Sequence, residues 1–363
     1  MSEAELLLGL VVATALVFDF TNGFHDTANV VATSISTRAM APRIAVGYAA
    51  ALNFAGAFIS LEVAATIAED VVDPLAITTT VIFAGLIGAI TWNLITWYFG
   101  LPSSSSHALI GGVVGSTFVA AGADAVFGDG ILGKVLIPAL IAPVLAFVVG
   151  GVAIVICYWV VGRQRPGPVS RGFRFGQVAS GGLLALAHGT NDAQKTMGVI
   201  ALALIASGHL GTGEDPPLWV IVSAASAIAL GTYSGGWRII RTMGTRIIKM
   251  DPAQGFSAQG AGAAVILASS HFGFPLSTTQ VIAGGVMGAG AGKRLSAVRW
   301  GVAGNIVTAW VLTLPAAATI GGVTYLVTDL FPGALGPVLV SAVGLALVAF
   351  AFARRIRQPV PGT

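Results

Sequence analysis

Long apolar stretches, separated by short charged or Pro/Gly-rich connections, make up most of this chain. Each is close to the roughly 20 residues that a helix needs to cross the hydrocarbon core of a bilayer. The stretches lie at 4–37, 43–62, 75–98, 102–122, 131–161, 176–208, 217–236, 255–271, 275–291, 299–326 and 334–353. All should be helical, because lipid cannot satisfy the open edge of a strand. The pattern predicts an all-α, polytopic membrane protein with about 11–12 membrane segments.

Two of these stretches, 4–37 and 176–208, are too long for one straight span and carry polar residues midway. We expect each to be a broken or steeply tilted helix, with re-entrant hairpins elsewhere. The first stretch has no basic region before it, so we do not expect a cleaved signal peptide.

Composition excludes an ordinary water-soluble protein. Hydrophobic residues make up 55% of the chain and charged residues only 9%, against roughly 25% charged in soluble domains. The single cysteine, Cys157, excludes an internal disulfide, a Cys-rich zinc site and an iron–sulfur cluster. The Gly-rich run at 288–294 lacks the spacing of a phosphate-binding loop. Soluble-enzyme motifs and an ATP-binding domain are missing, so we do not expect an enzyme, and any transport would have to be secondary.

Basic residues are concentrated on alternate connections. Of the 18 Lys and Arg residues, 16 fall there: Arg38, Arg43, Arg163, Arg165, Arg171, Arg174, Arg238, Arg241, Arg246, Lys249, Lys293, Arg294, Arg299, Arg354, Arg355 and Arg357. The other connections carry Glu69, Asp70, Asp73, Asp124, Asp129, Glu214, Asp215 and Asp329. Because positive loops stay in the cytoplasm, the expected place is the cell (plasma or inner) membrane, with the N-terminus outside and the C-terminus inside.

Two motifs occur twice, which indicates a duplication. Residues 22–29 align with 188–195, and residues 99–115 align with 272–288. The predicted organisation is a first membrane repeat at 1–162, a basic cytoplasmic linker at 163–175, a second repeat at 176–326 and an extra C-terminal helix and tail at 327–363. Since the first unit has five crossings, an odd number, the repeats should be inverted, as in many secondary transporters.

The first repeated motif places ionisable groups inside predicted spans, where a charge costs a few kcal/mol. These groups are Asp26, Asp192 and Lys195, beside the amides and hydroxyls of Asn29, Asn191, Gln194, Thr27 and Thr196. Such oxygens suit a hard cation, and a carboxylate beside a histidine can carry a proton. A structural ion pair is the alternative, but recurrence in both halves favours a function.

The second repeated motif predicts two fresh helix starts. Pro102 and Pro275 stop an incoming helix, and the hydroxyl residues after them are good N-caps. A helix start presents unpaired N–H groups and the positive end of the helix dipole, which bind anions. The hydroxyls are those of Ser104, Ser105, Ser106, Ser277, Thr278 and Thr279. A polar turn at the membrane interface is the alternative for one copy. The glycines that follow should allow close helix packing: Gly111, Gly112, Gly115, Gly284, Gly285 and Gly288.

Four of the five histidines also fall in the duplicated regions: His25, His107, His188 and His271. Each alone could be a satisfied histidine at a helix interface.

With these motifs, residues 1–326 resemble the inorganic phosphate transporter (PiT) family, in its low-affinity bacterial and archaeal branch. Residues 20–29 look like the first signature of that family and residues 189–196 like the second. The resemblance implies an inverted-repeat symporter for inorganic phosphate that forms a homodimer. We expect phosphate at Ser104, Ser105, Ser106, Ser277, Thr278, Thr279, Gln194 and Lys195. We expect the coupling ion at Asp26, Asn29, Asp192, Asn191, His25 and Thr196.

One departure concerns the coupling ion. Many sodium-coupled members read Gly-Ala-Asn-Asp where this chain reads Gly23-Phe24-His25-Asp26. The variant is similar to the branch thought to be proton-coupled and able to carry metal–phosphate complexes, so both Na⁺ and H⁺ stay open. A sulfate-carrying branch leaves the anion open as well.

The leading hypothesis is a phosphate:cation symporter that works by alternating access. An anion channel on the same fold is a second possibility, although buried carboxylates would repel the permeant ion. A membrane-embedded sensor is a third, but the chain has no sizeable soluble domain through which to signal. We expect no resident cofactor, no structural metal and no nucleic-acid partner; the partners should be phosphate, Na⁺ or H⁺, lipid and a second copy of the chain.

Overall fold

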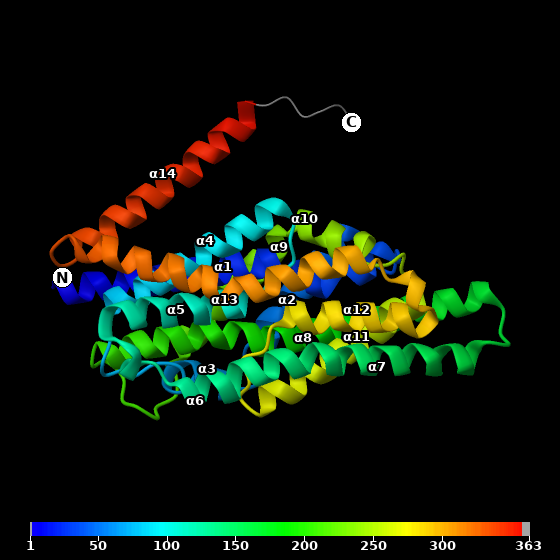
Figure 1. Ribbon diagram of the computed structural model, residues 1–363. Coiled ribbons are helices and arrows are strands. Elements are labelled where there is room, and N and C mark those ends of the chain that lie inside the picture. The colour runs from blue at the N-terminus through cyan, green and yellow to red at the C-terminus, as the bar shows by residue number, and fades with distance from the viewer. Residues whose placement is uncertain (1, 358–363) are drawn as a thin grey trace.

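Long helices running side by side form the body of the molecule (Figure 1). The computed structural model describes residues 2–357, and residues 348–357 only by their backbone. Within that range the one β interaction is an isolated bridge between Val72 and Val126. The predicted all-α class is confirmed.

The helices follow the apolar stretches closely. The first set is α1 (Glu3–Ser36), α2 (Pro42–Gly56), α3 (Glu62–Glu69), α4 (Thr79–Phe99), α5 (Ser105–Ala121), α6 (Gly128–Gly130) and α7 (Ile137–Val161), with a π-helical turn, Ile131–Leu136, before α7. The second set is α8 (Pro166–Ala206), α9 (Leu218–Ser234), α10 (Trp237–Arg241), α11 (Pro252–His271), α12 (Thr278–Lys293), α13 (Trp300–Asp329) and α14 (Leu335–Arg357).

The two long stretches are not broken, so of the two alternatives for them only a steep tilt stays a prediction. Helices α1 and α8 run unbroken for 34 and 41 residues, because their polar side chains find protein around them instead of lipid. Most of the predicted linker at 163–175 is also helical, since α8 begins at Pro166. Proline fits the first turn of a helix, where its missing N–H would have no partner. At 1.5 Å per residue, α8 is longer than the bilayer core is thick, and its first turns are exposed.

Fewer helices than the apolar pattern suggested are both long and apolar enough to cross a membrane by themselves. In the described part of the chain, four are long and apolar enough: Glu3–Ser36, Thr79–Phe99, Gly128–Val161 and Trp300–Asp329. A fifth results if α9 and residues 237–246, bent by 59°, count as one broken span. Helices such as α5 and α12 are shorter and largely buried. A helix wrapped by other helices does not need an apolar surface of its own.

Helix packing repeats itself when the two halves are exchanged. Helix α1 packs on α9 as α8 packs on α2, and α4 packs on α5 as α11 packs on α12. Helix α13 packs on α5 as α7 packs on α12. One long helix of each half therefore packs against the other half. These matched pairs are what a duplicated chain would form; the inversion of one half stays a prediction.

The glycines after the Ser/Thr segments lie at these crossings. A Cβ on Gly111 or Gly115 would meet the backbone of α13, and one on Gly284 or Gly288 would meet the backbone of α7. The expected packing role of the repeated glycines is confirmed.

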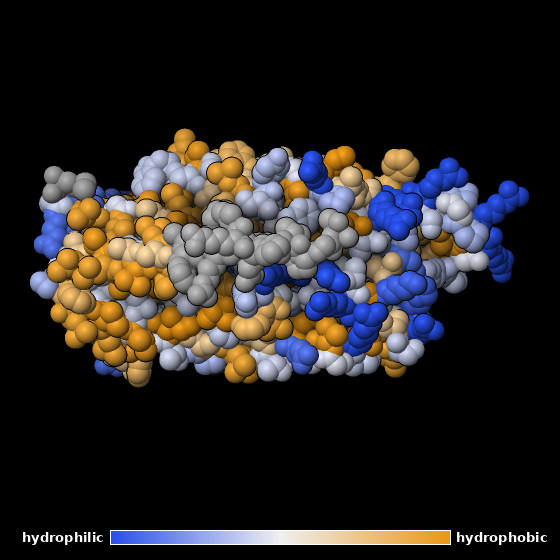
Figure 2. Space-filling model, turned by 90° about the horizontal axis from the view of Figure 1, so that it is seen from above, coloured by the Kyte–Doolittle hydropathy of each residue, from blue (hydrophilic) through white to orange (hydrophobic). Residues whose placement is uncertain are grey.

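Charged residues gather at the two ends of the bundle. Figure 2 shows hydrophilic side chains crowded at one end and an apolar surface over much of the rest. That end holds the α7–α8 connection, with Arg163 and Arg165. Helices α3 and α6 lie toward the other end (Figure 1), where Glu69, Asp70 and Asp129 surround a shallow pocket.

Candidate substrate and ion site

The Ser/Thr segments form two helix starts, as predicted. Ser104 caps α5, and its hydroxyl accepts a hydrogen bond from the His107 amide at 3.1 Å. Ser277 caps α12 and accepts from the Gln280 amide at 3.3 Å. Both caps are buried, so the positive ends of two helix dipoles lie inside the protein.

These two starts meet in the middle of the molecule. The Ser106 hydroxyl donates to the Leu276 carbonyl at 3.0 Å, and the Gln280 amide nitrogen lies 3.3 Å from His107 Nδ1. The two segments, which are far apart in the sequence, are therefore in direct contact. A pair of adjoining helix N-termini offers a strong anion site.

Asp26, on α1, faces both helix starts and is 2% exposed. Its Oδ1 accepts from Ser105 at 3.3 Å and from Thr279 at 3.3 Å, and its Oδ2 accepts from Thr278 at 3.4 Å. His25 Nδ1 lies 2.6 Å from the same carboxylate. In the described residues these are its only partners, and none carries a permanent positive charge.

Asp192, on α8, is fully buried and is compensated by a lysine. Lys195 donates to Asp192 Oδ1, to the Ser106 hydroxyl and to the Leu276 carbonyl. All three N–H bonds of the ammonium group are thus in use. Asp192 Oδ2 accepts from Thr278 at 3.1 Å, so the single proton of that hydroxyl is shared between the two carboxylates.

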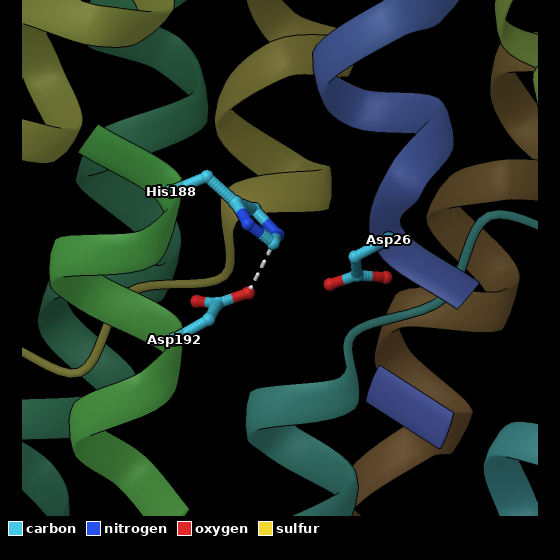
Figure 3. A group of neighbouring side chains, drawn as sticks. All are labelled: Asp26, His188 and Asp192. Carbon is cyan, nitrogen blue, oxygen red and sulfur yellow. Dashed lines mark ion pairs between the residues drawn. The ribbon is translucent and has the colours of Figure 1, made fainter. Parts of the chain in front are cut away.

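A third side chain, His188, completes a cluster with the two carboxylates. Its Nε2 lies 3.0 Å from Asp192 Oδ2, close enough for an ion pair but not aligned as a hydrogen bond. Figure 3 shows the His188 ring on α8 directed toward Asp26 on α1. One ligand atom from each of Asp26, His188 and Asp192 lies within 4.8 Å of the others, a spacing that could hold a cation.

Several buried oxygens near this cluster have no hydrogen-bond donor among the described residues. They belong to Asn29 Oδ1, Asn191 Oδ1, Thr196 Oγ1 and both oxygens of Asp19. Buried polar atoms are normally paired, so these oxygens are available to an ion or a substrate.

The other predicted residues are anchored by their neighbours. Asn29 donates to Thr279 at 2.9 Å, and Asn191 donates to Ser270 at 2.9 Å. Gln194 accepts from the Val63 amide, in the first turn of α3, at 2.8 Å. Gln194 therefore caps α3 here, and its role toward phosphate stays a prediction.

Sequence reasoning did not single out Asp19 or give His188 a role. Asp19 is a lone carboxylate in the apolar run of α1, and this charge inside a span was a signal in itself. His188 lies one helical turn before Asp192, which puts both on one face of α8.

Known proteins of one family resemble this chain over most of its length. The model of the phosphate transporter family matches residues 22–170 and again residues 162–321. A probable low-affinity inorganic phosphate transporter of Mycobacterium leprae is 54% identical over 92% of this chain and 81% of the relative. Its counterpart in Bacillus subtilis is 43% identical over 90% of this chain and 98% of the relative. A solved structure described as the sodium-dependent phosphate transporter shares the fold, with a TM-score of 0.80 at 24% identity, over 90% of this chain and all of that one. This multi-pass membrane protein is therefore a member of the phosphate transporter family.

Proposed function

We propose that this chain takes up inorganic phosphate by symport with a cation and works by alternating access. The observation that carries the proposal is the meeting of two buried helix starts, α5 and α12, beside the carboxylates of Asp26 and Asp192. An anion site and a cation site in contact are what a symporter needs, because each bound ion lowers the cost of burying the other.

Phosphate would bind at the helix starts. The hydroxyls of Ser104, Ser105, Ser106, Ser277, Thr278 and Thr279 supply donors without adding charge, and the first backbone amides of α5 and α12 add the dipole contribution. Lys195 adjoins Ser106 and would draw the anion toward the site. A passive anion channel is less well supported, since Asp26 and Asp192 would repel an anion that travelled without a cation.

The coupling cation would bind in the carboxylate cluster. Asn29 and Thr196 supply bare oxygens, and His25 lies against Asp26. Oxygen ligands of this kind suit Na⁺, whereas the His25–Asp26 pair suits a proton. The solved relative is described as sodium-dependent, which supports Na⁺; the histidine supports H⁺.

Uptake of radiolabelled phosphate into proteoliposomes tests this function. We expect accumulation against a gradient when either a Na⁺ or a pH gradient is imposed alone, and the effective gradient identifies the cation. Unlabelled phosphate should compete, and sulfate should compete only if the site accepts both anions. Flux that no cation gradient can concentrate would contradict symport.

A charge-removing variant tests the site. Asp26→Asn should abolish concentrative uptake, because the cluster would lose the one carboxylate that has no permanently charged partner in the protein. Asp124→Asn, at an exposed position, is the matched control and should transport normally. Normal accumulation by Asp26→Asn would remove Asp26 from the mechanism.

The homodimer and the membrane orientation stay predictions, which crosslinking and labelling can test.

A further inference from the structure

Within the repeated motif at 22–29 and 188–195, the two halves of the site differ in one permanent charge. The repeated motif aligns residues 22–29 with 188–195, so Asn29 in the first half corresponds to Lys195 in the second. Both lie three residues after the aspartate of their own half, on the same helix face. The duplication has thus placed a neutral amide beside Asp26 and an ammonium group beside Asp192.

The contacts of these two residues correspond as well. Asn29 donates across the site to the Thr279 hydroxyl, at the start of α12. Lys195 donates across the site to the Ser106 hydroxyl, at the start of α5. Ser106 and Thr279 occupy equivalent positions in the second repeated motif. Each side chain therefore does the same structural task in its own half.

Their electrostatic effects are opposite. Asn29 leaves its own oxygen, Oδ1, buried and without a donor, so the first half keeps an open cation ligand beside Asp26. Lys195 fills the equivalent place with a positive charge and directly pairs with Asp192. A buried carboxylate that already has an ammonium partner gains little from a second cation.

We infer that Lys195 is a tethered cation that permanently occupies the second half of the ion site, and that only the Asp26–Asn29 half exchanges a coupling cation. This inference rests on the proposed symport and narrows it. A chain with an amide at both positions would bind one more cation for each phosphate. Lys195 thereby sets the ion stoichiometry of transport.

Replacing the lysine with its counterpart tests the inference. Lys195→Asn should open a second cation site, so that reversal-potential measurements in proteoliposomes show one additional positive charge moved with each phosphate. Lys249→Asn, which removes an exposed lysine at the basic end, should keep the wild-type value. A Lys195→Asn protein with unchanged stoichiometry would overturn the inference, and a raised KM for phosphate in that protein would leave Lys195 with a role toward the anion alone.

A double variant separates the charge pair from the exchanging site. Asp192→Asn alone leaves Lys195 as an uncompensated buried charge and should lose uptake. Asp192→Asn with Lys195→Asn removes a neutral pair, so the double variant should melt closer to the wild type than Asp192→Asn does, and the uptake that remains should keep the wild-type stoichiometry. If the double variant moves one cation fewer with each phosphate, Asp192 itself exchanges a cation and the inference is wrong.

A binding measurement works without transport. When wild-type uptake is driven by a Na⁺ gradient, Na⁺ in place of N-methylglucamine should raise the melting temperature of Lys195→Asn in detergent by more than that of the wild type, because the variant has the extra site. An equal shift for both proteins would contradict the inference. Symport itself is judged on wild-type uptake alone, so failure of the proposed function would be recognised separately.

Discussion

Buried carboxylates in this molecule differ in how well their surroundings compensate them. Asp192 has a lysine, a threonine hydroxyl and a nearby histidine, whereas Asp26 has hydroxyls and His25. Asp19 has no hydrogen-bond partner within the described residues, although it is fully buried. A charge without partners in a low-dielectric interior costs several kcal/mol, so Asp19 destabilises the fold unless an ion or a proton joins it.

Replacing Asp19 should therefore stabilise the protein. Asp19→Asn has nearly the same shape and no charge, and we expect the free energy of unfolding to rise by about 1–3 kcal/mol. Its phosphate uptake should fall, because residues kept at a cost in stability usually serve function. Thermal melting in detergent and proteoliposome uptake measure the two effects.

Asp26→Asn provides the comparison, since Asp26 already has partners that the substitution would disturb. It should melt at or below the wild-type temperature. A destabilised Asp19→Asn protein would mean that the Asp19 carboxylate has a favourable partner after all.

Duplication explains which of these residues could be predicted from sequence. Asp26 and Asp192 were found because they recur at matched positions, and the same alignment places Ala185 opposite Asp19. A residue such as Asp19, which has no counterpart in the other half, cannot be found by this recurrence. The contacts of Lys195 with Ser106 and Leu276 could not be predicted either, because they join segments about 80–90 residues apart along the chain.

Helix starts were predictable to within a few residues because their chemistry is local. Proline followed by hydroxyl residues located the first turns of α5 and α12. Continuity was less predictable: α1 and α8 remain intact through polar segments because other helices cover them. The apolar pattern alone does not show which polar segments will be covered by other helices, and that cover decides whether a helix continues.

Close helix crossings depend on glycine at a few positions. A Cβ on Gly88 of α4 would lie 2.8 Å from the Gly321 nitrogen and 2.9 Å from the Ala317 oxygen, both backbone atoms of α13. We expect Gly88→Ala to push α4 and α13 apart and to lower stability by about 1–3 kcal/mol, measured by thermal melting in detergent.

The control is Gly304→Ala on α13, where nothing lies within 4 Å of the added Cβ. This variant should be neutral or more stable, because alanine favours a helix over glycine by roughly 1 kcal/mol. Equal effects of the two substitutions would show that helix propensity, not packing, decides the outcome at Gly88.

Asp251 joins three helices at the basic end. It caps α11 by accepting from the Gln254 amide, and it also accepts from Tyr158 on α7 at 2.6 Å and from Lys293 on α12 at 3.0 Å. Burial disfavours its charge, but these hydrogen bonds outweigh burial and hold the pKa of the Asp251 carboxyl below its usual value.

Stability should follow that lowered pKa. The charged form is favoured in the folded state, so its contribution is complete above the unfolded pKa of about 3.9 and is lost as the pH falls through the folded pKa. Asp251→Asn keeps a good cap without the charge. Its deficit in melting temperature should be largest near neutral pH and shrink on acidification; a constant deficit would contradict the charge argument.

At the scale of the whole molecule, charge and apolar surface divide the protein along its length. Hydrophilic side chains crowd one end of the bundle and apolar surface covers much of the rest (Figure 2), while Glu69, Asp70 and Asp129 gather around one pocket toward the other end. This division was predictable from loop composition alone. The number of helices long and apolar enough to cross a membrane was not predictable, because burial by neighbouring helices allows short or polar helices into the interior.

Loop charge also predicts orientation, since basic connections stay in the cytoplasm. Gly167, near the start of α8, and Thr212, between α8 and α9, are exposed at opposite ends of that helix. In a Cys157→Ala background, a membrane-impermeant thiol reagent applied to intact cells should label Thr212→Cys and leave Gly167→Cys unlabelled. Gly167→Cys should react once the membrane is permeabilised, which controls for its accessibility. Labelling of Gly167→Cys from outside would reverse the assignment: the acidic end would then face the cytoplasm, and both termini would exchange sides.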